Sequence, residues 1–87
     1  MRVIFDRTFK KNLNKAPANI QQAFHTRLDL FLSNPYHPLL RNHALKGLYQ
    51  NCRSINITGD WRAIYTEIDD GAIAFFIQFG THSQLYK

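Results

Sequence analysis

His82, in the C-terminal stretch GTHSQLYK, is the residue best placed for chemistry. Histidine titrates near neutral pH and can therefore act as a general acid or a general base. His82 follows the segment FFIQFG at residues 75–80, which predicts a buried strand that ends at Gly80. Its imidazole ring is thus expected to emerge just past the end of a β-sheet, on a well-defined backbone.

Other polar and aromatic side chains are expected near the same sheet edge. Asp60 and Trp61 open the predicted neighbouring strand, and Arg62 follows them. Tyr86 comes four residues after His82. An imidazole, a carboxylate, an indole, a phenol and a guanidinium group would then gather at one place, which is compatible with catalysis. The alternative is structural: a core indole, a turn carboxylate, a capping imidazole and a phenol that anchors the tail.

The remaining reactive side chains do not form a recognisable site. Cys52 is the only cysteine, which excludes an internal disulfide framework and a cysteine-based zinc cluster and fits a reducing compartment. No glycine-rich phosphate loop and no pair of carboxylates suited to acid–base catalysis stands out. The histidines lack the paired spacing of metal ligands, so neither a metal site nor a cofactor is expected. They are His25, His37, His43 and His82.

Composition indicates a basic globular protein. Of 87 residues, 45% are apolar, and 11 Lys and Arg against 6 Asp and Glu give a net charge of +5. This charge favours association with polyanions, so nucleic acid is the first partner to consider, although many small domains are basic without such a role. We expect one cytoplasmic domain over residues 1–87, with no secretory leader. The longest apolar run, residues 72–77, is far shorter than the ~20 residues of a membrane span.

The N-terminal half predicts a strand and two helices. RVIF at residues 2–5 has strand composition, and Asp6 is a suitable N-cap for a helix over residues 6–15. A second helix begins near Pro17 and ends before the dipeptide NP at residues 34–35. Because only a few residues join them, the two helices should form an antiparallel hairpin.

The C-terminal half predicts a sheet. After a loop over residues 34–48, the short turns TGD and DDG separate segments of strand composition at residues 49–57, 61–68 and 72–79. The predicted fold class is therefore α+β: an N-terminal helical hairpin packed on a small antiparallel β-sheet, in the order β-α-α-β-β-β. The strand at residues 2–5 would be added at an edge of this sheet.

Alternation along these strands predicts one core face and one open face. The core face should hold residues of one parity on each strand: Ile55 and Ile57, then Ile64, Thr66 and Ile68. The opposite face, which includes Ser54 and Asn56, should be open. An open sheet face on a basic domain is a plausible binding surface.

Two segments together carry a resemblance to a known family. HALKGLYQNCRSINITGDWRAIY at residues 43–65, followed by GTHSQLY at residues 80–86, resembles the RelE/ParE superfamily of bacterial toxins, and most closely its YafQ-type mRNA interferases. The resemblance implies a RelE-like fold and a toxin of a type II toxin–antitoxin system. It also implies a ribosome-associated endoribonuclease that uses metal-free acid–base catalysis and 2′-OH attack. The implied partners are a cognate antitoxin, mRNA in the ribosomal A site, and operator DNA reached through the antitoxin complex.

The resemblance also assigns roles to individual residues. His82 matches a terminal proton donor or acceptor, Arg62 a contact to the scissile phosphate, and Tyr86 an aromatic residue that positions the substrate. The full set implied for catalysis is His82, His43, Asp60, Arg62 and Tyr86. The set implied for RNA binding is Trp61, Asn56, Arg53 and Gln78, and the parity of Arg53 also fits a structural role.

The sequence departs from the family pattern at two of these positions. Asn56 stands where the YafQ branch has histidine and the RelE branch has lysine, and an amide cannot exchange protons near pH 7. Gln78 stands where the YafQ branch has arginine, which removes a cation near the phosphate. Cleavage is therefore expected to be weakened. Two alternatives stay open: a non-nucleolytic, ParE-like gyrase inhibitor, and a catalytically degenerate toxin retained for antitoxin binding.

Overall fold

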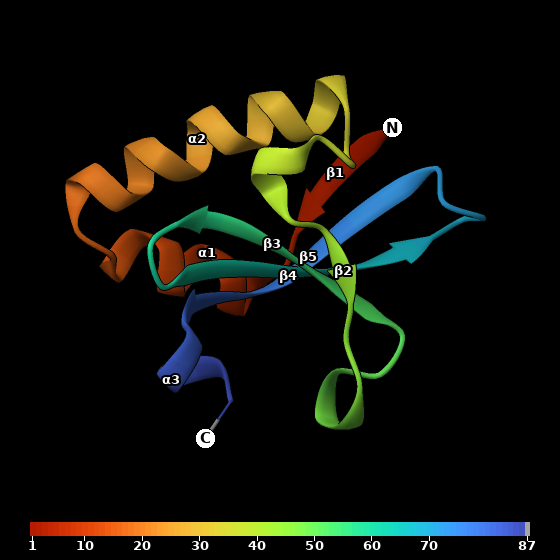
Figure 1. Ribbon diagram of the computed structural model, residues 1–87. Coiled ribbons are helices and arrows are strands. Elements are labelled where there is room, and N and C mark those ends of the chain that lie inside the picture. Colours follow the sequence, from red (N-terminus) through yellow and green to blue (C-terminus); the bar gives the residue numbers. More distant parts are fainter. Residues whose placement is uncertain (87) are drawn as a thin grey trace.

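The computed structural model describes residues 1–86 and contains a five-stranded sheet in the order β1-β5-β4-β3-β2, with two helices on one face and a short C-terminal helix on the other (Figure 1). The strands are β1 (Arg2–Phe5), β2 (His43–Ala44), β3 (Cys52–Thr58), β4 (Trp61–Ile68) and β5 (Ile73–Thr81). The helices are α1 (Arg7–Lys15), α2 (Ala18–Ser33) and α3 (His82–Leu85), and the 3-10 turns are η1 (Pro38–Leu40) and η2 (Gly47–Tyr49). The predicted α+β class is confirmed.

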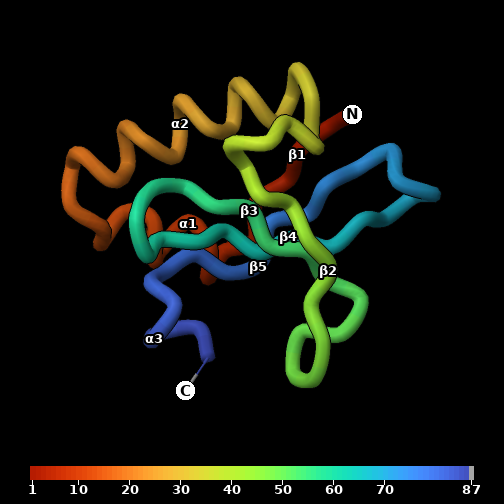
Figure 2. The backbone as a smooth tube through the Cα atoms, viewed as in Figure 1, coloured from red at the N-terminus to blue at the C-terminus, as the bar shows by residue number. Residues whose placement is uncertain are grey.

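The strand order differs in detail from the prediction. β1 lies at an edge, as expected, but pairs in parallel with β5, because the helical hairpin carries the chain back across the sheet. The other three pairings are antiparallel. The segment 34–48, predicted to be a loop, contains β2, which pairs with β3 through His43↔Ser54 and Ala44↔Arg53. A strand of two residues is too short to show the alternation that identifies strands in a sequence. Figure 2 shows this segment crossing from the end of α2 to the β2 edge.

The helices begin and end where local chemistry favours it. The Asp6 carboxylate accepts a hydrogen bond from the Thr8 N–H at 2.9 Å and so caps α1. Helix α2 follows Pro17 and ends before Asn34, whose N–H bonds to the Leu30 carbonyl. Among residues 1–86, no helix is long and apolar enough to cross a membrane.

The core lies between the helices and the sheet. Helix α1 packs on β5 and α2 packs on β3. Phe9 and Phe24 bring their rings to 5.6 and 6.2 Å from the Phe76 ring, centroid to centroid. Ile55 and Ile57 of β3 are buried in this core, as the alternation predicted.

The opposite face is more covered than expected. Ser54 pairs with Ile64, so both lie on the face predicted to be open, yet both are fully buried. Placing Ile64, Thr66 and Ile68 on the core face was therefore wrong, because all three have the parity of the opposite face, and Ile68 is 40% exposed. The expectation that Ser54 is open was also wrong. The physical reason is that α3 and the η2 turn fold back on the side of the sheet away from α2 (Figure 1). This arrangement leaves only part of the face accessible.

Candidate active site

A row of three residues crosses the open face from β3 to β5. Asn56 pairs with Arg62, so their side chains share one face, and Arg62 pairs in turn with Gly80, which has no side chain and leaves the β5 end of the row uncovered by one. The Arg62 Nη1 donates to Asn56 Oδ1 at 2.6 Å, to the Gly59 carbonyl at 2.8 Å and to the Trp61 carbonyl at 3.1 Å. All three acceptors are neutral. Within residues 1–86, the Nε and Nη2 groups of Arg62 have no hydrogen-bond partner, so this edge of the guanidinium is available to an anion.

Helix α3 is fixed to the end of β5 by a capping box. The Gln84 N–H donates to Thr81 Oγ1 at 3.3 Å, and the Thr81 N–H donates to Gln84 Oε1 at 2.9 Å. The His82 N–H donates to the Asp60 carbonyl at 3.0 Å, which ties α3 to the turn before β4. A Cβ on Gly80 would lie 2.9 Å from Gln84 Oε1, so a larger residue there would have to displace the Gln84 side chain of the capping box. His82 therefore stands at a fixed place beside the row that holds Arg62.

Three aromatic rings form a cluster around α3. The His82 and Tyr86 rings lie 4.7 Å apart, and the Tyr86 and Tyr49 rings lie 5.7 Å apart, centroid to centroid. The Tyr49 hydroxyl donates to the Leu85 carbonyl at 3.1 Å. Burial raises the pKa of Tyr49, and the neighbouring Tyr86 and Cys52 add to this effect. The Tyr49 phenol therefore stays protonated at neutral pH and remains a donor.

His43 lies on the same face, at the outer strand of the sheet. It pairs with Ser54, so it shares the face of Asn56 and Arg62. Its Nδ1 lies 2.8 Å from the Arg41 carbonyl oxygen, which can only accept, so Nδ1 carries the hydrogen. The neutral ring then leaves Nε2 with a lone pair that can take a proton. Two strand spacings, about 10 Å, separate β2 from β4, so His43 shares this face with Arg62 but lies at a distance from it.

Two predicted residues are not joined to this site by their side chains. The Asp60 carboxylate is exposed and makes no hydrogen bond to a histidine among residues 1–86. Arg53 lies on the helix side of the sheet, where its Nε donates to Asn42 Oδ1 at 2.7 Å and its guanidinium lies 5.4 Å from the Tyr36 ring centroid. Arg53 thus has the structural environment that its parity allowed.

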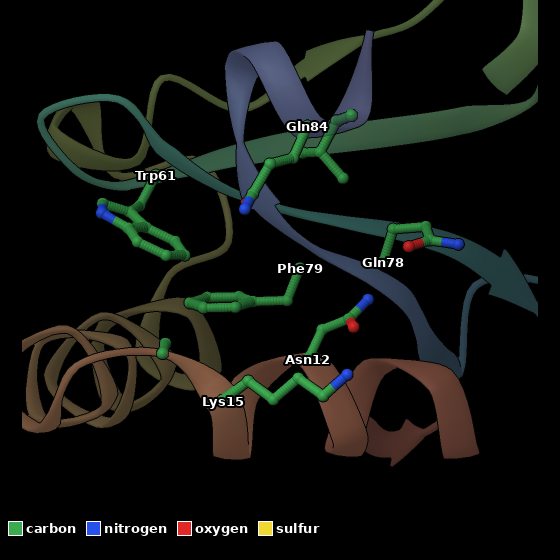
Figure 3. A pocket seen from close by; sticks show the side chains of 8 residues that line it. Asn12, Lys15, Trp61, Gln78, Phe79 and Gln84 are labelled. Atoms are coloured by element: carbon green, nitrogen blue, oxygen red, sulfur yellow. The ribbon is translucent and has the colours of Figure 1, made fainter. Parts of the chain in front are cut away.

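A hollow of about 250 Å³ opens beside the site, between α1, the end of β5 and α3 (Figure 3). Trp61 stacks on Phe79 along one side, with ring centroids 5.6 Å apart. Gln78 reaches it from β5. Its lining comprises Asn12, Lys15, Ala16, Trp61, Gln78, Phe79, Gln84 and Leu85. Trp61 and Gln78 therefore both line this hollow, and Gln78, which pairs with Ile64, also lies on the sheet face of Arg62.

Sequence reasoning missed Tyr49 and two polar residues of the hollow, Asn12 and Gln84. Tyr49 directly follows the glycine-containing turn after His43, a position from which an aromatic side chain can fold back on the sheet. Asn12 lies on the polar side of α1 and carries no signal of its own. Among residues 1–86, no group of three or more His, Cys, Asp or Glu side chains could hold a metal ion.

Comparisons with known proteins give consistent matches. A family model described as the bacterial toxin of type II toxin–antitoxin system, YafQ, matches residues 1–87. The crystal structure of YafQ from E. coli superposes with a TM-score of 0.82 at 21% identity, covering 100% of both chains. A YoeB/ParE toxin from Agrobacterium tumefaciens gives a TM-score of 0.77 at 19% identity, over 94% of this chain and 99% of that chain.

A third match comes from a complex. The intact E. coli RelBE toxin–antitoxin complex gives a TM-score of 0.69 at 22% identity, over 92% of this chain and 94% of the matched chain. A comparison with curated proteins finds no match. At these identities, the structural matches establish the fold alone.

Proposed function

Because the chain belongs to the YafQ family of type II toxin–antitoxin toxins, we propose that it is a metal-free endoribonuclease that cleaves mRNA on the ribosome. The observation that carries this proposal is the open face itself. Arg62 presents a guanidinium edge there, while His43 lies on the same face and His82 stands on the adjoining helix. A cation and two imidazoles are the groups that phosphodiester transfer needs.

The reaction uses the nucleophile that RNA carries. The His43 Nε2 takes the proton from a 2′-OH, and the 2′-oxygen attacks the adjacent phosphorus. The bond from phosphorus to the 5′-oxygen breaks, and His82 in its protonated form gives that oxygen a proton. The products are a 2′,3′-cyclic phosphate and a 5′-OH end. The hydrogen on His43 Nδ1 supports the role of His43 as the base, because that tautomer leaves Nε2 with a lone pair that can accept a proton.

Arg62 supplies charge stabilisation in this mechanism. Negative charge builds on the phosphate oxygens as the pentavalent state forms, and a fixed guanidinium stabilises it without having to reorient. The Nε and Nη2 donors lie in the fork geometry that matches two phosphate oxygens. The Asp60 carboxylate, exposed on the neighbouring turn, would act only through the charge it places near this edge.

Aromatic and amide groups beside the site would hold the RNA chain. Tyr86 is 37% exposed, so its ring can stack on a base next to the scissile bond. Trp61 and Gln78 would receive a neighbouring base in the hollow of Figure 3, with Lys15 close to its phosphate. Stacking of a base on an aromatic ring contributes about 1–3 kcal/mol. Arg53, bonded to Asn42 on the other face, has no part in this proposal.

A cognate antitoxin would hold the toxin inactive. The matched RelBE structure is described as a toxin–antitoxin complex. The net charge of +5 would favour an acidic segment in such a partner, and operator DNA would be reached through that complex.

The proposal is tested by expressing the protein in a bacterial host and mapping cleavage of translated mRNA by primer extension. We expect 2′,3′-cyclic phosphate ends and cleavage that needs no metal ion beyond the Mg²⁺ that keeps the ribosome assembled. Replacing His82 with alanine should slow cleavage by about 10²- to 10⁴-fold. The fold should be unchanged because His82 is exposed. His25→Ala, at an exposed position on α2, is the matched control and should cleave at the wild-type rate.

The same preparations should be tested for inhibition of gyrase supercoiling. Gyrase inhibition without mRNA cleavage would contradict the proposal and support the ParE-like alternative. mRNA cleavage that requires added Zn²⁺, or Mg²⁺ beyond what the ribosome itself needs, would contradict the metal-free mechanism. Antitoxin binding with neither activity would identify a degenerate toxin.

A further inference from the structure

The family resemblance places Asn56 where the YafQ branch has histidine and the RelE branch has lysine. Its amide cannot transfer protons, so the proposed mechanism gives it no chemical step. It nevertheless makes the shortest side-chain hydrogen bond of the site, accepting from Arg62 Nη1 at 2.6 Å. The Asn56 side chain is therefore joined directly to the guanidinium of Arg62.

We propose that Asn56 is a positioning residue that holds Arg62 for phosphate binding while leaving its full positive charge available. This inference rests on the proposed function. The Asn56 oxygen engages one terminal nitrogen of the guanidinium, and the Nε and Nη2 edge remains open for the phosphate. The chain would thus replace a proton-transferring side chain with one that orients a cation.

The backbone of the β3–β4 hairpin completes this hold. Gly59 adopts a φ of +51°, and its carbonyl accepts from the same Nη1 at 2.8 Å. The register shifts between Asn56 and Thr58, where the hairpin bulges beside Arg62. An arginine side chain that is already fixed loses less conformational entropy when an anion binds. RNA binding would therefore be favoured, because the Arg62 side chain is already ordered in the free protein.

The acceptors that hold Arg62 Nη1 are also uncharged, which leaves the positive charge of the guanidinium available to a phosphate. A carboxylate at position 56 would form a two-point ion pair with Arg62 and cancel its charge. The three groups that hold Nη1 are instead an amide and two backbone carbonyls. No carboxylate among residues 1–86 lies in ion-pair contact with Arg62. The guanidinium is thus held firmly without being neutralised.

The test is an NMR titration of the ¹⁵N-labelled full chain with uridine 3′-monophosphate, observing the Arg62 Nε–Hε signal. In the wild type, we expect this signal to shift on binding. Asn56→Asp should raise the Kd about tenfold, because a negative charge is placed near the phosphate. Asn56→Ala should raise it by a smaller factor, about threefold, because the guanidinium loses one of its anchors.

A purely structural role for Asn56 makes a different prediction. An aspartate keeps the acceptor oxygen and would hold Arg62 at least as well, so stability and affinity would be unchanged or improved. The matched control is Asn51→Asp, which adds the same charge at an exposed position about 16 Å along the strand direction, and it should leave the Kd within about twofold. Backbone amide spectra of each variant report whether the sheet is intact. If Asn56→Asp does not fold, Asn56→Ala decides the question.

The possible outcomes separate this inference from the proposed function. Wild-type affinity in Asn56→Asp or Asn56→Ala, or no response of the Arg62 signal in the wild type, would overturn the inference even if mRNA cleavage is intact. Affinity that depends on Asn56 in a protein that does not cleave mRNA would uphold the inference about Arg62 and refute the ribonuclease. Where cleavage occurs, kcat/KM should fall in the same order as the affinities.

Discussion

The two faces of the β-sheet are stabilised in different ways. On the face under α1 and α2, aromatic rings such as Phe9, Phe24 and Phe76 are at most 1% exposed and pack against one another. On the opposite face, α3 and the η2 turn are held by individual hydrogen bonds, among them that from the Tyr49 hydroxyl to the Leu85 carbonyl. Burying one large apolar side chain contributes about 1.5–3 kcal/mol, whereas one hydrogen bond contributes about 0.5–1.5 kcal/mol.

This difference separates the protein's stability from its chemistry. The helix face holds the fold together, and it offers polar groups to a substrate only at the hollow, where Asn12 and Lys15 of α1 lie. The opposite face offers polar groups that are fixed in place at a small energetic cost each. Substitutions on the two faces should therefore have separable effects, with global unfolding on one side and altered placement of the site on the other.

On the helix face, the substitution expected to reduce the free energy of unfolding most is Phe9→Ala. The Phe9 ring is fully buried and lies 5.4 to 5.6 Å from four other phenylalanine rings, so its removal leaves a cavity. The expected loss is about 3–5 kcal/mol, a large part of the roughly 5–15 kcal/mol of a typical domain. Urea unfolding followed by circular dichroism measures this loss.

Leu48→Ala, at a side chain that is 86% exposed, is the control and should change the free energy of unfolding by no more than about 0.5 kcal/mol. A cost for Phe9→Ala as small as that of the control would show that the helix face does not carry the stability.

The helix face is also the part of the fold that the sequence predicts well. The cap at Asp6, the proline that opens α2 and the glycine-containing turns mark element boundaries within a few residues. Regular alternation correctly placed Ile55 and Ile57 in the core. These signals are local, so a single sequence is enough to detect them.

The site face is predicted less well, because its contacts are not local. The burial of Ser54 and Ile64 depends on segments that fold back from elsewhere in the chain. The aromatic contact between Tyr49 and Tyr86 joins the η2 turn to the end of α3. The bond from Arg62 to Asn56 crosses a hairpin whose register shifts at a bulge, which counting along the strand does not reveal.

A smaller effect is expected from Thr81→Val, which removes the hydroxyl of the capping box and keeps the branched shape. Helix α3 should lose about 1 kcal/mol of local stability, so the Tyr86 amide, bonded to the His82 carbonyl, should exchange with solvent roughly fivefold faster. Global unfolding should change little because the helix-side core is untouched. Hydrogen exchange followed by NMR makes the measurement.

The control for this prediction is Thr26→Val. The Thr26 hydroxyl bonds only to the Gln22 carbonyl within the exposed side of α2, so its loss should be close to neutral. A change in the midpoint of global unfolding as large as the local effect would mean that α3 is part of the cooperative core. The contrast between the two faces would then be wrong.

The smallest effect is expected from Tyr49→Phe, which removes the bond to the Leu85 carbonyl and keeps the ring beside Tyr86. The cost should be about 0.5 kcal/mol, at the low end for a hydrogen bond, because water can replace the donor at the surface. Tyr36→Phe is the control, since the Tyr36 side chain is 59% exposed and its hydroxyl makes no hydrogen bond among residues 1–86.

The loss of stability caused by Tyr49→Phe should also depend on pH. Burial raises the pKa of Tyr49 above its usual range, so its protonated form is favoured in the folded state. Its contribution to stability is fully present below about pH 10, the usual tyrosine pKa, and is lost as the pH rises through the raised pKa of the folded state. The difference in unfolding free energy between wild type and Tyr49→Phe should therefore shrink in strongly alkaline solution. A difference that stays constant from pH 8 to beyond that range would show that the phenol contributes through its ring alone and that its hydroxyl does not hold α3.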